Sequence, residues 1–140
     1  MDSKKISIIN QIDQLELIQV FVEELSEAWS LSPEMTFNLN LILEEYVTNL
    51  IHYGYSDNGE HRISIEFILT EQQLRIEVIN DAGPFDLTEI PDNQDIDKPA
   101  SERSIGGLGI HFIKALSDHM EYHSEEGFNK LMIIKNLPAN

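Results

Sequence analysis

Residues 32–55 read SPEMTFNLNLILEEYVTNLIHYGY, and this stretch decides how the chain folds. Ser32 followed by Pro33 is typical of the cap and first turn of a helix. Beyond them, apolar residues recur every three or four positions, as on the buried face of a helix: Leu39, Ile42, Leu43, Tyr46, Val47 and Leu50. The pattern predicts a helix that ends near Tyr53 and Gly54, where glycine can take a left-handed terminal conformation.

A second helix and several strands are expected on either side of this stretch. Residues 12–29 carry apolar side chains at helical spacing with acidic residues between them. Residues 4–9 alternate weakly and suit a short edge strand. Downstream, residues 62–68 and 74–79 alternate between apolar and polar side chains. A turn at residues 70–73 separates these two runs, so they predict a β-hairpin.

A long connection, a third helix and two more strands complete the predicted order. Residues 82–105 contain three prolines, many acids and few apolar residues, which is typical of a lid or a disordered segment. The glycine-rich run at 106–109 opens a helix that extends through Met120, and residues 121–124 and 130–135 are strand-like. Helices grouped around hairpin strands predict one α+β domain over residues 1–140. We expect a two-layer sandwich whose sheet has one covered face and one solvated face.

Composition excludes several classes of function. The 140 residues include 25 Asp and Glu but only 9 Lys and Arg, a net charge of −16. Without a basic cluster the chain is not expected to bind nucleic acid or an anionic membrane surface. The absence of cysteine excludes disulfides, thiolate metal sites and a cysteine nucleophile. The acidic first 30 residues suit neither a signal peptide nor a membrane span, so we expect a cytoplasmic protein.

A carboxylate and a carboxamide share one face of the predicted helix. Glu45 and Asn49 are four residues apart and are offset by only about 40° around the axis, and His52 stays near that face. Glu44 lies about 140° from Asn49 and points elsewhere. The pair could hold a hard cation or orient a hydroxyl group, and the alternative is a solvated helix edge.

Two further motifs carry possible ligand chemistry. Residues 81–85, DAGPF, follow a strand, where Asp81 could accept a hydrogen bond from an exocyclic amine and Gly83 could admit a flat ring. Ordinary turn chemistry is the alternative there. The glycines at 106–109 could direct backbone N–H groups at an anion or could form a hinge. The five histidines show no compact metal-ligand spacing, and no Gly-x-Ser-x-Gly elbow is present.

In this order the three motifs resemble the nucleotide boxes of the GHKL ATPases. The closer resemblance is to the anti-sigma factor serine/threonine kinase branch, of the RsbW and SpoIIAB type. It rests on residues 45–55, on Asp81-x-Gly83-Pro84-Phe85 and on Gly106-Gly107-Leu108-Gly109, and it covers residues 5–137. It implies a Bergerat fold, in which a mixed, mostly antiparallel sheet has helices on one face. ATP would lie under a lid at about residues 82–105.

The resemblance also implies a role for each motif. Glu45 would be the general base for a substrate Ser or Thr hydroxyl, and Asn49 would coordinate the Mg²⁺ that bridges the phosphates. Asp81 would bind the adenine amino group, with Gly83 permitting its close approach. The other implied nucleotide-binding residues are His52, Phe85, Arg103, Gly106, Gly107, Leu108 and Gly109. Some members of the branch carry an arginine beside or inside the glycine run, and here Arg103 is the nearest candidate.

The implied function is an ATP- and Mg²⁺-dependent serine/threonine kinase that is also an anti-sigma factor. It would sequester a sigma factor, phosphorylate a STAS-domain antagonist and form a homodimer. The alternative is a non-catalytic ATP-binding module that switches partners, although the presence of Glu45 favours the kinase. A detached histidine-kinase ATP domain would need an upstream phosphoacceptor histidine, but the earliest histidine is His52. A domain with vestigial boxes and no nucleotide binding is a further alternative.

Overall fold

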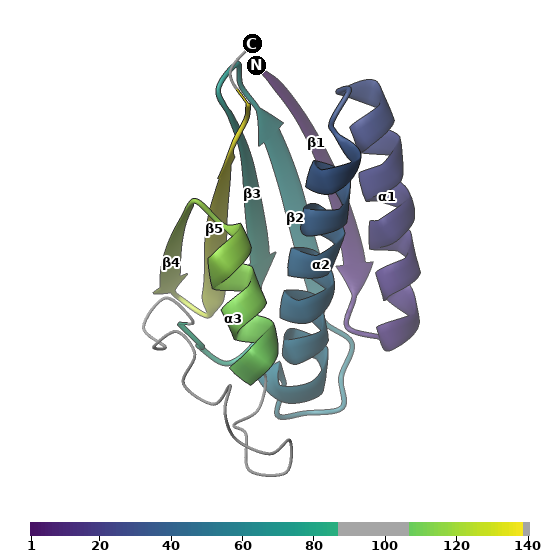
Figure 1. The fold of residues 1–140 in the computed structure, drawn as a ribbon. Coiled ribbons are helices and arrows are strands. Elements are labelled where there is room, and N and C mark those ends of the chain that lie inside the picture. Colours follow the sequence, from purple (N-terminus) through teal and green to yellow (C-terminus); the bar gives the residue numbers. More distant parts are fainter. Residues whose placement is uncertain (87–106, 139–140) are drawn as a thin grey trace.

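An antiparallel sheet forms one layer of the molecule, as the computed structural model shows for residues 1–86 and 107–138 (Figure 1). Its strands are β1 (Asp2–Ile9), β2 (Arg62–Leu69), β3 (Gln73–Asn80), β4 (His119–Glu125) and β5 (Phe128–Asn136). They lie in the order β1-β2-β3-β5-β4. All four pairs of this described sheet are antiparallel, whereas the resemblance implies a mixed sheet that is mostly antiparallel.

The helices α1 (Leu15–Ala28), α2 (Pro33–Asn49) and α3 (Gly107–Leu116) cover one face of this sheet (Figure 1). A short 3-10 turn, Ile12–Gln14, precedes α1, and a π-helical turn, Leu50–Gly54, extends α2. The predicted α+β sandwich with helices on one face is therefore confirmed. None of the helices in the described part of the chain is long and apolar enough to cross a membrane.

The apolar stripe predicted for α2 forms the centre of the core. Ser32 caps the helix by accepting a hydrogen bond from the Met35 backbone N–H at 3.1 Å. Four side chains of the stripe are fully buried: Leu39, Ile42, Leu43 and Val47. They belong to one cluster with the inward residues of β2 and β3, which are Ile63, Ile65, Phe67, Leu74, Ile76 and Val78. Burial of each such side chain contributes about 1.5–3 kcal/mol, which fixes α2 across the central strands.

Two expectations about helix ends are wrong. The third helix ends at Leu116 instead of continuing through Met120, which lies in β4. The Asp118 backbone N–H already donates to the Ile134 carbonyl at 2.9 Å, so pairing with β5 replaces the helix there. Gly54 is not left-handed, because among the described glycines only Gly127, in the β4–β5 turn, has a positive φ.

The three motifs belong to elements that meet at one end of the sandwich. The C-terminal end of α2, the end of β3 and the start of α3 all lie at the lower end of Figure 1. The helices α2 and α3 pack against each other. Because β3 runs toward this end and α2 runs the same way, their C-terminal residues emerge close together.

Candidate functional site

A cavity of about 270 Å³ opens between the end of α2 and the segment that follows β3. It is lined by Tyr46, Asn49, Leu50, Tyr53, Gly54, Gly83, Pro84 and Phe85. Two segments about 30 residues apart in the sequence thus line the same cavity. Three of the lining residues are predicted site residues: Asn49, Gly83 and Phe85. The apolar rings give the cavity flat walls that suit a planar ligand.

Asn49 lines this cavity, and Glu45 precedes it by one turn of the same helix. The Asn49 Nδ2 atom donates to the Glu45 backbone carbonyl at 2.7 Å, so the Oδ1 atom is the part of the amide left to coordinate a ligand. The Glu45 side chain is half-buried, and burial, followed by the charge of Glu44, raises the pKa of its carboxyl. A raised pKa brings a carboxylate closer to the range in which it accepts a proton efficiently.

Glu44 faces a different part of the surface. It is exposed and lines a hollow of about 410 Å³ between α1 and α2, together with Phe37 and Asn40. This hollow is larger than the cavity at Asn49, but it contains none of the predicted site residues. Glu44 is therefore not part of the cavity at Asn49.

The close approach of Gly54 to the segment after β3 shapes the cavity floor. The Gly83 backbone N–H donates to the Gly54 carbonyl at 2.7 Å. A Cβ atom on Gly54 would lie 3.0 Å from the Cβ of Ala82, which is tighter than ordinary packing. This contact, and not a left-handed conformation, is the reason that glycine occupies position 54. A Cβ atom on Gly83 would meet only the Gly54 carbonyl oxygen, at an ordinary 3.5 Å.

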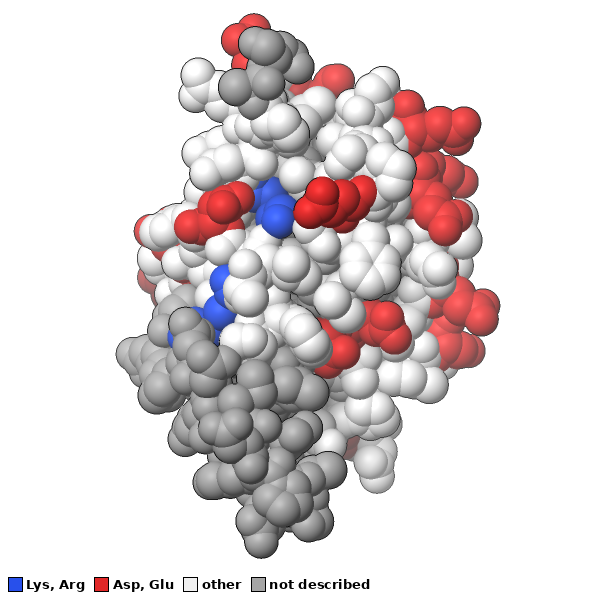
Figure 2. Space-filling model, in the orientation of Figure 1, with Lys and Arg blue, Asp and Glu red and all other residues white. Residues whose placement is uncertain are grey.

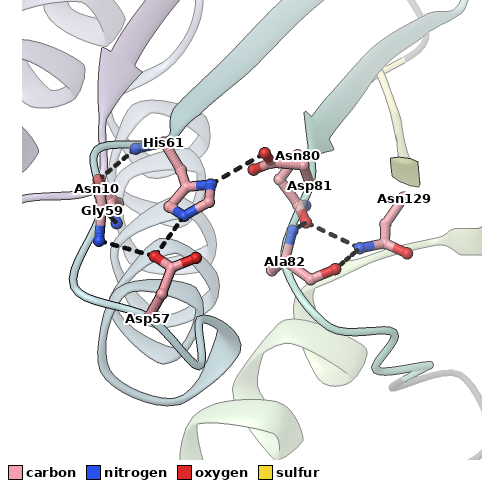
Figure 3. A network of polar contacts seen from close by, with 8 residues as sticks. All are labelled: Asn10, Asp57, Gly59, His61, Asn80, Asp81, Ala82 and Asn129. Carbon is pink, nitrogen blue, oxygen red and sulfur yellow. Dashed lines mark hydrogen bonds and ion pairs between the residues drawn. The ribbon is translucent and has the colours of Figure 1, made fainter. Parts of the chain in front are cut away.

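Buried amides fix the backbone where β3 enters this segment (Figure 3). The Asn129 Nδ2 atom donates to the Asn80 Oδ1 atom at 3.1 Å and to the Ala82 carbonyl at 2.6 Å. The Asn80 Oδ1 atom also accepts from the Ala82 backbone N–H at 3.1 Å. Because Asn80 and Asn129 are almost fully buried, removing either amide would deprive the other of one of its hydrogen bonds.

Asp81 lies between these amides and the loop that follows α2. Its side chain is 39% exposed, and its Oδ2 atom lies 2.9 Å from the Nδ1 atom of His61. The other ring nitrogen of His61 lies 2.8 Å from Asp57 Oδ1. Asp81 adjoins the cavity through Ala82 and Gly83, but its carboxylate is directed toward His61 (Figure 3).

The remaining predicted residues lie elsewhere or outside the described part of the chain. His52 is exposed and lines a neighbouring hollow of about 380 Å³ with Asp57 and Asn58, not the cavity at Asn49. Gly107, Leu108 and Gly109 form the first turn of α3. Arg103, Gly106 and residues 87–105 of the lid predicted at about 82–105 lie outside the described residues.

Sequence reasoning did not assign several residues that the structure places at the site. Tyr46 and Leu50 belong to the apolar stripe and to the motif at residues 45–55, and the sequence assigns neither a role at the site, although both line the cavity. His61 and Asn129 gave no local signal, because their contacts cross 20 and 47 residues of sequence. Contacts between residues so far apart in the sequence leave no short motif that would predict them.

The fold is that of the histidine kinase-like ATPase domains. The family model described as "Histidine kinase-like ATPase domain" matches residues 8–135, and the chain belongs to this family.

Among its relatives are a serine-protein kinase and an anti-sigma factor. The serine-protein kinase RsbW of Listeria monocytogenes serovar 1/2a is 26% identical over 72% of this chain and 66% of that kinase. The anti-sigma F factor of Bacillus thuringiensis is 32% identical over 73% of this chain and 69% of that factor. The chain thus spans slightly less than two thirds of the Listeria kinase.

A solved structure shows the same fold. It is the crystal structure of the RsbU and RsbW domains of Rv1364c from Mycobacterium tuberculosis, with a TM-score of 0.68. The match covers 99% of this chain and 34% of that one, at 14% identity, so it bears on the fold alone.

Proposed function

We propose that this chain is an ATP-dependent serine/threonine protein kinase and anti-sigma factor. It phosphorylates a STAS-domain antagonist and sequesters a sigma factor, as a homodimer in the cytoplasm. The observation that carries the proposal is that Asn49, one helical turn after Glu45, lines one cavity together with residues 83–85. The names of its relatives, a serine-protein kinase and an anti-sigma factor, support it.

In this proposal the cavity holds ATP, and the chain supplies position and proton transfer. The apolar rings and Gly83 receive the adenine, and Asp81 accepts a hydrogen bond from its exocyclic amine. The substrate hydroxyl oxygen attacks the γ-phosphorus of ATP, ADP leaves, and the hydroxyl proton passes to Glu45. Phosphoryl transfer depends mainly on positioning and charge neutralisation, with the base adding about 10²–10⁴-fold.

The residues present fit a magnesium ion that is shared with the nucleotide. The described residues contain no group of three or more His, Asp or Glu that could hold a metal by themselves. Mg²⁺ needs no such cage, since it is usually held by one or two protein oxygens together with substrate phosphates. Asn49 Oδ1 is the oxygen that would serve. When bound, the ion neutralises charge on the phosphates.

The acidic surface of the chain suits a basic partner. Acidic side chains dominate the side of the molecule that carries α1, with few basic ones in view (Figure 2). With a net charge of −16, the chain would attract a basic region of a sigma factor through long-range electrostatics.

Incubation with labelled ATP, Mg²⁺ and a STAS-domain protein from the same genome tests the proposal. We expect label to transfer to a Ser or Thr of the STAS protein. Tight ATP binding without transfer would instead identify a non-catalytic module that switches partners. Failure to bind ATP at all would reject both functions.

ATP affinity is expected to depend strongly on Mg²⁺. A chain with a net charge of −16 disfavours a polyanionic ligand unless a cation compensates. Calorimetry should give an affinity at least about tenfold weaker in excess EDTA than in excess Mg²⁺, a difference of about 1.4 kcal/mol. Equal affinities in the two buffers would contradict this expectation.

Replacing Gly83 by Ala should weaken ATP binding without harming the fold. The new methyl group meets only ordinary contacts in the protein but occupies space at the cavity wall. We expect the free energy of unfolding to stay within about 0.5 kcal/mol and ATP affinity to fall roughly tenfold. Urea unfolding and calorimetry measure the two quantities.

Gly54→Ala is the matched comparison. Its methyl group would crowd Ala82, so we expect a loss of about 1–3 kcal/mol of folding free energy. If Gly83→Ala bound ATP as tightly as the unmodified chain, the adenine could not lie against Gly83.

A further inference from the structure

His61 lies between the carboxylates of Asp57 and Asp81, and Asp81 is the residue proposed to bind adenine (Figure 3). Its Nδ1 atom is 2.9 Å from Asp81 Oδ2, and its Nε2 atom is 2.8 Å from Asp57 Oδ1. The imidazole is stacked on the Tyr55 ring, with centroids 4.5 Å apart and planes 21° apart. Only 19% of the His61 side chain is exposed, so the ring is held on several sides.

The geometry favours a protonated imidazole. A neutral histidine has one N–H donor, and its other nitrogen would direct a lone pair at a carboxylate oxygen. The imidazolium instead donates to both aspartates. Hydrogen bonds to Asp81 and then to Asp57 accordingly raise the pKa of His61, and the bond to His61 lowers the pKa of Asp57.

The backbone around His61 is fixed to the end of β1. The His61 N–H donates to Asn10 Oδ1 at 2.8 Å, and the Asn10 N–H donates to the His61 carbonyl at 3.0 Å. Asp57 is fixed in turn, because its Oδ1 atom accepts the Gly59 N–H at 2.7 Å. The contact with Asp81 is therefore made by an anchored ring and differs from an ordinary surface ion pair, which is mobile and weak.

We propose that protonated His61 is a positioning residue for the base of the nucleotide. It holds the Oδ2 atom of Asp81 and leaves the Oδ1 atom to accept a hydrogen bond from the exocyclic amino group of adenine. The inference rests on the proposed function, in which Asp81 binds adenine. Asp57 holds the far side of the imidazole and keeps it charged.

This arrangement favours adenine over guanine. Adenine presents an amino donor where guanine presents a carbonyl acceptor. A carboxylate accepts hydrogen bonds and cannot donate them, so an Asp81 held by His61 recognises the amino group and repels the carbonyl. Loss of His61 therefore weakens ATP binding specifically, while the already weak binding of GTP changes little.

The pH dependence has a definite sign. The folded-state pKa of His61 is raised, so the charged contact is complete at low pH and is lost as pH rises through that value. The pKa of Asp57 is shifted the other way: it is lowered, so the Asp57 carboxylate stays ionised to lower pH.

Three titratable side chains contact the His61 ring: Asp57, Asp81 and Tyr55. Asn10, which is bonded to the His61 backbone, is uncharged. The charged residues Glu60 and Arg62 are the neighbours of His61 along the chain. Burial and the Asp81 charge raise the pKa of Tyr55 to about 12, so it does not titrate in the same range.

Calorimetry of Mg²⁺-ATP and Mg²⁺-GTP binding between pH 6.5 and 9.5 tests the inference. For the unmodified chain we expect ATP affinity to fall roughly three- to tenfold across this range. His61→Gln should show the weaker ATP affinity already at pH 6.5, with little further change. His123→Gln, an exposed histidine on β4, is the control and should keep the original profile.

Asp57→Asn provides a second readout. It leaves the bond between His61 and Asp81 in place but removes one of the two charges that raise the pKa of His61. We therefore expect the midpoint of the affinity loss to move to lower pH, which a merely structural role of the loop would not produce. This variant also keeps the inference testable if His61→Gln unfolds.

The outcomes separate the two levels of the proposal. If the unmodified chain binds ATP but His61→Gln has the same affinity and pH profile, the role of His61 is overturned and the proposed function stands. If the midpoint of the affinity loss in Asp57→Asn stays at the pH found for the unmodified chain, the role of His61 is also overturned. If the unmodified chain binds no ATP, the proposed function and this inference both fall.

Discussion

Glu45→Gln should lower the rate of phosphoryl transfer to a STAS-domain partner by about 10²–10⁴-fold, the usual contribution of a positioned general base. The glutamine has the same shape but cannot accept the hydroxyl proton. Glu45 is half-buried one helical turn from Asn49, and its pKa is raised by burial, both of which suit a base beside the γ-phosphate. ATP affinity should be unchanged, because the carboxylate acts on the substrate hydroxyl. Initial rates with labelled ATP and calorimetry measure the two effects.

Glu44→Gln is the matched control, since it makes the same change one residue earlier on the same helix. Glu44 lines the hollow between α1 and α2, so the variant should transfer phosphate at the original rate. Unchanged transfer by Glu45→Gln would eliminate Glu45 as the base. A loss confined to Glu44→Gln would assign the base to the other carboxylate and would contradict the geometry of α2.

Asn49→Ala should abolish most of the benefit that Mg²⁺ gives to ATP binding. The Asn49 side chain lines the cavity, and its Nδ2 atom is already bonded to the Glu45 carbonyl, so Oδ1 is the atom available to the ion. We expect affinity in Mg²⁺ to fall at least about tenfold, or 1.4 kcal/mol. Affinity in EDTA should stay the same, so the ratio of the two affinities should approach one.

Asn38→Ala serves as the control for Asn49→Ala, because Asn38 is a half-buried residue in the first half of the same helix and does not line the cavity. It should keep the full Mg²⁺ dependence and the original melting temperature. Should Asn49→Ala retain the Mg²⁺ dependence of the unmodified chain, the ion would have to be held by other oxygens. An equal loss of affinity in Mg²⁺ and in EDTA would indicate a role in shaping the cavity instead.

Much of the fold could be predicted because its signals are local. The three- and four-residue spacing on α2 follows from 3.6 residues per turn, and the alternation in β2 and β3 follows from the pleat of a strand. Ser32 and Pro33 mark the start of α2 because the cap is made within one turn. The buried stripe and the hairpin were correct for these reasons.

The helix ends could not be predicted in the same way. The end of α3 depends on the Asp118 N–H finding the Ile134 carbonyl, and on Lys135 Nζ donating to the carbonyl of Leu116. The glycine at 54 is required by Ala82, which is 28 positions further along the chain. In both places a partner from a distant strand or loop overrides the local preference.

The sequence by itself determined which segments become helices and strands, and which residues carry carboxylate, amide and glycine chemistry. Periodicity and capping are properties of neighbours along the chain, so they need no knowledge of the final packing. Only the tertiary structure decided that Asn49 and Gly83 line one cavity and that His61 lies between Asp57 and Asp81. These placements follow from the burial of α2 against the sheet and from the hydrogen bonds that fix the end of β3. Packing sets the distances between residues that are far apart in the sequence.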